Sequence, residues 1–246
     1  MLALACLVFV GCAVEAAHPL ITEDTPTQGA GHWELELGNA LSGGGAASAY
    51  EFAPQLSYGV RDNLDLIARP TVLLVRPVDE RGQGGADVRG FGDASIDLKW
   101  RFFEWDANAL AVRAGIDVPT GSEARGLGSG HAGVHGLLAL THVAAPWAVH
   151  GNLGYALNRA DDGSRRTLLH ASAAAVVKVE ARVSVLVADA AVDTETDPSV
   201  GRWQRVLRSG LIWAVRPGLD VDMGYQWRLG GDGPSRVWLA GATGRW

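Results

Sequence analysis

Apolar and polar residues alternate along most of this chain, in segments of about ten residues separated by polar or glycine-rich connections. In residues 93–103, Ile96 and Leu98 alternate with Asp97 and Lys99. Such alternation indicates a β-strand with one apolar and one polar face. The pattern predicts about twelve strands, over residues 32–40, 50–59, 64–74, 93–103, 110–118, 134–143, 147–158, 167–179, 183–189, 207–215, 219–229 and 235–246.

The connections between these strands alternate in length. Outer-membrane β-barrels have short turns at the periplasmic end and longer loops outside, so the alternation places both termini in the periplasm. Residues 126–158 contain no Asp, Glu, Lys or Arg, but Pro146, several glycines and the alternating pattern argue against a membrane-spanning helix. Short connections are predicted at 60–63, 104–108, 144–146, 180–182 and 216–218, and long ones near 41–48, 77–90, 119–132, 159–166, 190–202 and 230–235.

The tryptophan positions indicate which face of the alternating strands points outward. A soluble β-sandwich or a lipocalin-like barrel alternates in the same way, with its apolar face turned inward. Aromatic rings at two levels and a last strand ending on Trp246 are typical of membrane–water interfaces. We therefore predict an all-β fold, a transmembrane antiparallel up-and-down β-barrel over residues 32–246. The interface aromatics are predicted as Trp33, Trp100, Trp147, Trp213 and Trp246 at the periplasmic rim, and Trp227 and Trp238 at the outer rim.

The first segment has the composition of a secretory signal peptide. Residues 1–17 are apolar and then small, with 14–16 as a cleavage site. Both cysteines, Cys6 and Cys12, lie here, so the mature chain would contain none; lipidation at Cys12 is the alternative. Residues 18–31 are predicted to form an N-terminal periplasmic arm, and the protein is expected in the outer membrane of a Gram-negative bacterium.

Charge and motifs exclude several function classes. The net charge of −6 gives no basic surface for nucleic acid. Zinc-ligand spacing, a phosphate-binding loop and a dinucleotide fingerprint do not occur in the sequence. We therefore expect no cofactor and no metal. The expected partners are outer-membrane lipid and lipopolysaccharide, the assembly machinery that reads the C-terminal strand, and a small-molecule solute.

Several stretches resemble a bacterial family named for a meta-pathway of phenol degradation, whose members are called outer-membrane transporters. The resemblance begins at residues 18–29, HPLITEDTPTQG, where the family typically shows HPLxTDDTxTQG. It continues through residues 58–66, 90–102 and 115–121 and the terminal strand. Glu23 and Pro26 depart mildly from the usual run. The resemblance implies a barrel and transport across the outer membrane. Any link to phenol rests only on the family's label.

Three small constellations offer chemistry besides transport. His170 and Ser172 share a strand face, but the polar face favours a hydrogen-bond network in the lumen over a lipid hydrolase. His131 and His135 make a weak metal site without an acidic partner and are interpreted as loop residues. Acidic residues 23 and 24 precede the first strand, where a solvated arm is favoured over a periplasmic plug or a partner-binding segment.

The inward charges are the strongest functional feature of the sequence. In a narrow barrel they either pair across the lumen and stiffen the wall, or line a constricted path whose charges set selectivity. The candidate lumen-lining residues are Glu34, Glu36, Glu51, Asp65, Arg69, Asp97, Lys99, Arg101, Arg113, Asp117, His150, Asn152, Asp220, Asp222, Arg228 and Arg245.

These features predict a non-enzymatic outer-membrane barrel for passive transport of small aromatic or otherwise hydrophobic solutes. The loops at 77–90 and 119–132 are candidate gates that fold inward. Two alternatives remain open at this stage. One is a closed structural or interaction barrel without a conducting pore, and the other is a lipid-modifying outer-membrane enzyme.

Overall fold

The computed structural model describes residues 18–43, 47–77, 86–158, 163–230 and 236–246, which form a single antiparallel sheet and one short 3-10 turn at Glu123–Arg125. The strands are β1 (Trp33–Gly43), β2 (Ala47–Arg61), β3 (Leu64–Arg69), β4 (Val72–Pro77), β5 (Val88–Phe91), β6 (Ala94–Trp105), β7 (Asn108–Val118), β8 (Gly133–Ala144), β9 (Trp147–Leu157), β10 (Thr167–Glu180), β11 (Val183–Thr194), β12 (Trp203–Arg216), β13 (Leu219–Gly230) and β14 (Arg236–Arg245).

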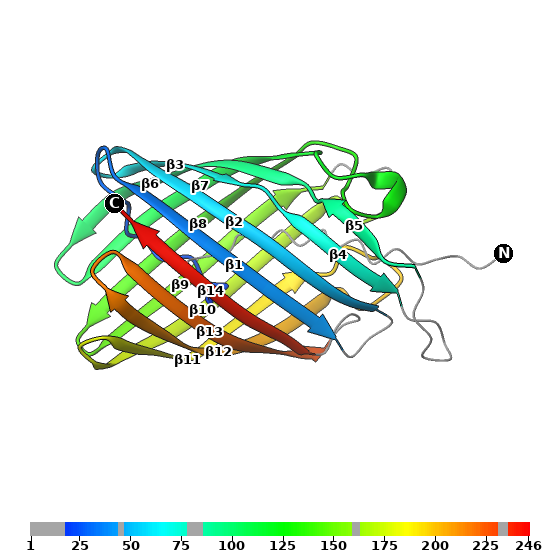
Figure 1. Ribbon diagram of the computed structural model, residues 1–246. Coiled ribbons are helices and arrows are strands. Elements are labelled where there is room, and N and C mark those ends of the chain that lie inside the picture. Colours follow the sequence, from blue (N-terminus) through cyan, green and yellow to red (C-terminus); the bar gives the residue numbers. More distant parts are fainter. Residues whose placement is uncertain (1–17, 44–46, 78–85, 159–162, 231–235) are drawn as a thin grey trace.

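The sheet closes on itself, because β1 pairs with both β2 and β14 (Figure 1). β3 and β4 both pair with β2 and are two halves of one wall strand, which we call a stave. The stave is interrupted at Pro70, because proline has no backbone N–H to donate to the hydrogen bonds of the sheet. β5 and β6 are likewise halves of the next stave, interrupted at Gly92 and Asp93. The described strands therefore make a closed barrel of twelve staves, as the sequence predicted.

The apolar face of the barrel wall points outward. Leu98 on β6 and Ile116 on β7 are 51% and 49% exposed, whereas Asp97, next to Leu98 and on the other face, is 1% exposed. A soluble barrel would show the reverse arrangement. The strands of 10–15 residues that are not split are long enough to cross a bilayer at a tilt. No helix among the described residues has the length and hydropathy needed to span a membrane.

Short turns gather at one end of the barrel, which we call the turn end, and long connections gather at the other, the loop end. Both Trp33 and Trp246 lie at the turn end, where the backbone N–H of Trp33 donates to the carbonyl of Trp246 at 2.9 Å. Figure 1 places the C-terminus at this end and the short 3-10 turn at the other. The predicted interface tryptophans are all exposed on the outer face, and Trp105 and Trp203, which the prediction omitted, are exposed as well.

Three predicted boundaries were wrong in extent. The loop expected at 77–90 contains the start of a stave, because β5 begins at Val88. The strand expected at 183–189 continues to Thr194, and the one expected from Leu207 begins at Trp203. The alternation is lost in β11 because a bulge separates Leu186 from Asp189 in the pairing with β12. The extra residue lets both side chains face inward, where both are fully buried.

The segment before β1 differs most from its expected position. Residues 18–28, which we call the arm, run inside the barrel rather than standing in the periplasm as a solvated segment (Figure 1). Thr22, Glu23 and Thr25 are at most 3% exposed. Their hydrogen-bond partners are inward-facing side chains of the wall, so the barrel interior supplies the polar contacts that water was expected to supply.

Candidate functional site

The barrel lumen and the arm within it form the candidate functional site. The arm begins near the middle of the wall, where the His18 imidazole bonds Asp222 on β13 and the His18 N–H donates to Glu36 on β1 at 3.0 Å. It ends at the turn end, where Thr27 Oγ1 donates to the carbonyl of Asp62 at 2.8 Å. Between these points the arm contacts strands around the lumen, so it occupies the barrel interior from Asp222 to the turn end.

Glu23 is the electrostatic centre of the arm. Its carboxylate lies 2.6 Å from Lys99 Nζ on β6 and 2.8 Å from Arg113 Nη1 on β7, and all three side chains are at most 6% exposed. Its backbone N–H and carbonyl are both bonded by the side-chain amide of Asn152 on β9, at 2.6 and 2.8 Å. Buried charges are tolerated when they are paired and hydrogen-bonded. The arm therefore supplies a carboxylate partner for two buried wall cations, whose burial without it would cost more free energy.

Asp189 is a second anchor, and the bulge in β11 aims it at the arm. Its carboxylate accepts the backbone N–H groups of Ile21 and Thr22 at 2.5 and 3.1 Å and the Thr22 hydroxyl at 2.6 Å. Leu186, on the other side of the bulge, packs against Leu20 of the arm. One local irregularity thus provides both a polar and an apolar contact for consecutive arm residues.

Glycines hollow the wall where the arm passes. Gly38 and Gly241 are paired across β1 and β14, and a Cβ on either would lie 3.0 and 2.6 Å from the His18 ring. Gly210 and Gly224 are paired across β12 and β13, and a Cβ on either would lie within 3.1 Å of the ring of Pro19. The inner surface of the wall is therefore shaped to fit the first two arm residues, which indicates that the arm is an integral part of the folded barrel.

Above the arm, toward the loop end, the lumen opens into a vestibule of about 320 Å³. His18 and Ile21 of the arm line it, but Glu23, Lys99 and Arg113 do not, so the vestibule ends at the arm. Its wall combines charged groups such as Arg228 with apolar side chains such as Leu168, a mixture that suits a small solute with polar and apolar parts. The apolar lining includes Leu73, Leu127, Leu157, Leu168, Val206, Val237 and Leu239.

One of the two predicted gating loops narrows the vestibule. Asp93 accepts hydrogen bonds from the Gly121 N–H at 3.0 Å, the Ser129 N–H at 2.7 Å and the Ser129 hydroxyl at 2.8 Å. This clasp turns Leu127 into the vestibule, where its side chain is 2% exposed. Most of the other predicted gate, 77–90, lies outside the described residues.

The predicted lumen-lining residues divide into three groups along the barrel axis. Those beside the arm are Glu34, Glu36, Asp65, Asp97, Lys99, Arg113, His150, Asn152 and Asp222, all buried. Those in the vestibule wall are Glu51, Arg69, Asp117 and Arg228. Those nearest the turn end are Arg101, Asp220 and Arg245. Arg245 joins Glu34 at 2.6 Å and Asp220 at 2.5 Å, so ion pairs link β14 to its two neighbouring strands at the turn end.

His131 and His135, the pair considered as metal ligands, have other partners in the structure. His135 lies between Asp97 and Asp117, and His131 Nδ1 bonds the Ser129 carbonyl at 2.9 Å. The described residues hold no cluster of three or more His, Cys, Asp or Glu that suits a metal ion.

His170 occupies a serine–histidine–aspartate arrangement on the inner face of the wall. Its Nδ1 lies 2.6 Å from Asp193 Oδ1, and its Nε2 lies 2.9 Å from Ser172 Oγ. A lipid-modifying enzyme would need this pair on the lipid face or at the rim. His170 lines the vestibule instead, and Ser172 Oγ also lies 3.4 Å from the Asn152 amide oxygen, which belongs to the arm's anchor. The arrangement therefore fits the polar network predicted for the lumen.

Sequence reasoning missed the arm's anchors Asp189 and Arg208. Arg208 Nη1 donates to the Pro19 and Leu20 carbonyls, each at 3.2 Å. The only signal available was the polar, non-alternating run 22–28 next to a barrel whose inner face is rich in charge. This signal did not identify which wall residues the arm contacts.

Comparison with known proteins places this geometry in a family. The family model described as "Putative MetA-pathway of phenol degradation" matches residues 27–246. The chain belongs to this family. A search of curated proteins gives no match.

Solved structures share the fold at low identity. An outer membrane channel from Pseudomonas putida F1 superimposes with a TM-score of 0.71 at 13% identity, covering 91% of this chain and 98% of that one. The NanC porin gives 0.62 at 9% identity, covering 85% and 98%. The KdgM porin gives 0.55 at 5% identity, covering 86% and 98%. These likenesses establish an outer-membrane barrel fold for this family member.

Proposed function

We propose that this family member is an outer-membrane channel for the passive passage of small solutes that are at least partly hydrophobic. The vestibule carries the proposal: a cavity of about 320 Å³ whose lining mixes apolar and charged side chains, enclosed by a membrane-type barrel. Passage needs no chemistry, because a polar lining replaces part of the solute's hydration while the apolar lining receives the rest of the molecule.

The arm sets the resting state of this channel in our proposal. It occupies the lumen through Glu23, Asp189 and the glycine hollows, so a solute in the vestibule crosses to the turn end only when the arm shifts. The wall strands pair with one another without using the arm, which allows the arm to move while the barrel stays closed.

The same filling favours the second candidate function, a closed structural or interaction barrel. The two are separated by solute efflux from liposomes, using as probes a small sugar and a small aromatic sulfonate, which do not cross the bilayer unaided. Wild-type protein is expected to leak both probes slowly, and a variant lacking residues 18–28 is expected to leak both faster. Liposomes that stay sealed with both proteins correctly inserted would leave only the closed barrel.

We further propose the route and surroundings of the mature protein. Residues 1–17 direct export as a signal peptide, the assembly machinery reads β14 and its terminal Trp246, and the barrel resides in the outer membrane with lipopolysaccharide around its loop end. Support comes from the exposed apolar wall and from the solvent-facing ring of Trp246, which is 62% exposed. Fractionation of cells that express variants with and without Trp246 tests the assembly step.

A further inference from the structure

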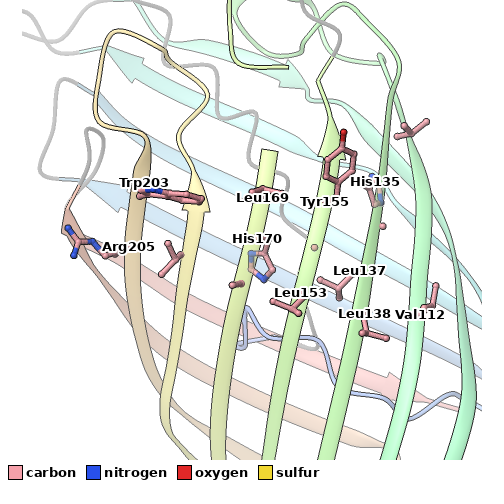
Figure 2. Close-up of a pocket in the computed structure, with 15 residues that line it drawn as sticks. Val112, His135, Leu137, Leu138, Leu153, Tyr155, Leu169, His170, Trp203 and Arg205 are labelled. Atoms are coloured by element: carbon pink, nitrogen blue, oxygen red, sulfur yellow. The ribbon is translucent and has the colours of Figure 1, made fainter. Parts of the chain in front are cut away.

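A large apolar hollow lies on the lipid-facing surface near the loop end, over β7 to β12 (Figure 2). Its volume is about 1040 Å³. Figure 2 shows Trp203, Tyr155 and Leu169 toward the loop end of the hollow, with Leu153 and Leu138 farther along the wall. The hollow is separate from the lumen, because the pairings of β8, β9 and β10 behind it are unbroken.

Small residues set among large ones create this hollow. On the lipid face Gly136 lies opposite Tyr155, and Leu153 lies opposite both Leu138 and Ala171. A Cβ added to Gly136 would meet nothing closer than 3.8 Å, so the space above this position is open. The hollow therefore offers a depression for a flexible apolar chain between larger side chains.

One cationic side chain, Arg205, lines the hollow at the loop end, and a second, Arg202, contacts the ring of its lining residue Trp203. Arg205 lies opposite Val192 in the pairing of β12 with β11 and lines the hollow itself. Arg202 stacks on the Trp203 ring, with its guanidinium carbon 5.4 Å from the ring centroid. Among the described residues neither guanidinium takes part in an ion pair. Guanidinium groups bind phosphate oxygens in bidentate fashion, and the loop end of such a barrel meets the outer leaflet.

We infer that this hollow is a binding site for a phosphorylated, acylated lipid of the outer leaflet. One acyl chain occupies the depression over Gly136 and Ala171, and a headgroup phosphate binds Arg202 and Arg205. The inference rests on the outer-membrane placement proposed above and is independent of transport, because every residue in it lies on the outer surface or at the rim.

The test is native mass spectrometry of the detergent-purified barrel with lipid A and with enzymatically dephosphorylated lipid A. Wild-type protein is expected to retain lipid A in preference to the dephosphorylated form. An R202Q/R205Q variant is expected to lose about tenfold or more in lipid A affinity, because hydrogen bonds between charged groups are removed. Arg236→Gln serves as the matched control, since Arg236 is exposed at the start of β14, away from the hollow.

A second variant tests the acyl chain. Gly136→Leu fills the hollow and is expected to weaken binding of both lipids, whereas Ala240→Leu, at an exposed lipid-face position on β14, is expected to leave binding unchanged. The Arg variants alter only exposed side chains and are expected to fold, so they still test the inference if Gly136→Leu fails to fold. Equal retention of lipid A and dephosphorylated lipid A, or no change in R202Q/R205Q, would overturn the inference.

Discussion

Glu23 Oε2 lies 2.8 Å from Arg113 Nη1, although 90 residues separate them in the chain. Glu23 belongs to the arm and Arg113 to the middle of β7, so this contact joins the segment before the first strand to the far wall. Arg113 also binds Asp97 at 3.0 Å and Gln55 at 3.1 Å. The arm thus completes a network that the wall has begun, which makes its attachment specific.

Neutralising Glu23 should loosen the arm. In Glu23→Gln the buried cations Lys99 and Arg113 each lose one charged partner and keep another, Asp24 and Asp97, so the cost falls below the ~3–5 kcal/mol of an uncompensated buried charge. We expect a higher single-channel conductance in planar bilayers. Asp24→Asn is the control, because the Asp24 side chain is 34% exposed and contacts Lys99 at 3.1 Å. An equal response of the two variants would contradict the central role of Glu23.

Filling a glycine hollow should expel the arm without touching its charges. A Cβ on Gly224 would lie 3.0 Å from Pro19 Cβ, so Gly224→Leu is expected to displace Pro19. Cleavage after Glu23 by a glutamyl endopeptidase, which needs the arm outside the lumen, measures the displacement. Gly151→Leu is the control, since the nearest atom to a Cβ there is 3.9 Å away. Protection of Glu23 in the Gly224 variant would show that the hollow does not hold the arm.

A channel opened by removal of the arm should prefer cations. The buried wall carboxylates Glu34, Glu36, Asp65, Asp97, Asp189 and Asp222 outnumber the buried wall cations Lys99, Arg113 and Arg208. The reversal potential in a potassium chloride gradient measures this preference for a variant lacking residues 18–28. An Asp189→Asn, Asp222→Asn pair in the same background should reduce it. Anion preference in the first variant would refute this electrostatic assignment.

Breaking the Asp93 clasp should free the loop that carries Leu127. Asp93→Ala removes the acceptor of three hydrogen bonds from residues 121 and 129, so we expect faster tryptic cleavage after the nearby Arg125. Asp197→Ala, which removes contacts only to Ser199 within another loop, is the control. Unchanged cleavage at Arg125 would mean that other contacts hold this loop.

Much of the wall was predictable from the sequence. Strand alternation repeats every two residues and is a local property, so it identified the staves and the outward position of Leu98 and Ile116. Errors arose where the backbone departs from regular pairing. Pro70 divides a stave, and the bulge after Leu186 shifts the alternation, so the strand that continues to Thr194 was predicted too short.

The sequence by itself determined a closed antiparallel barrel with its apolar face outward, because alternation, turn lengths and tryptophan positions are all read within short windows. Only the tertiary structure decided that the arm lies inside this barrel. The arm has no periodic pattern, and its position depends on wall partners such as Asp222, 204 residues from His18. Contacts of that range become visible only when the wall has closed and brought its buried charges around the arm.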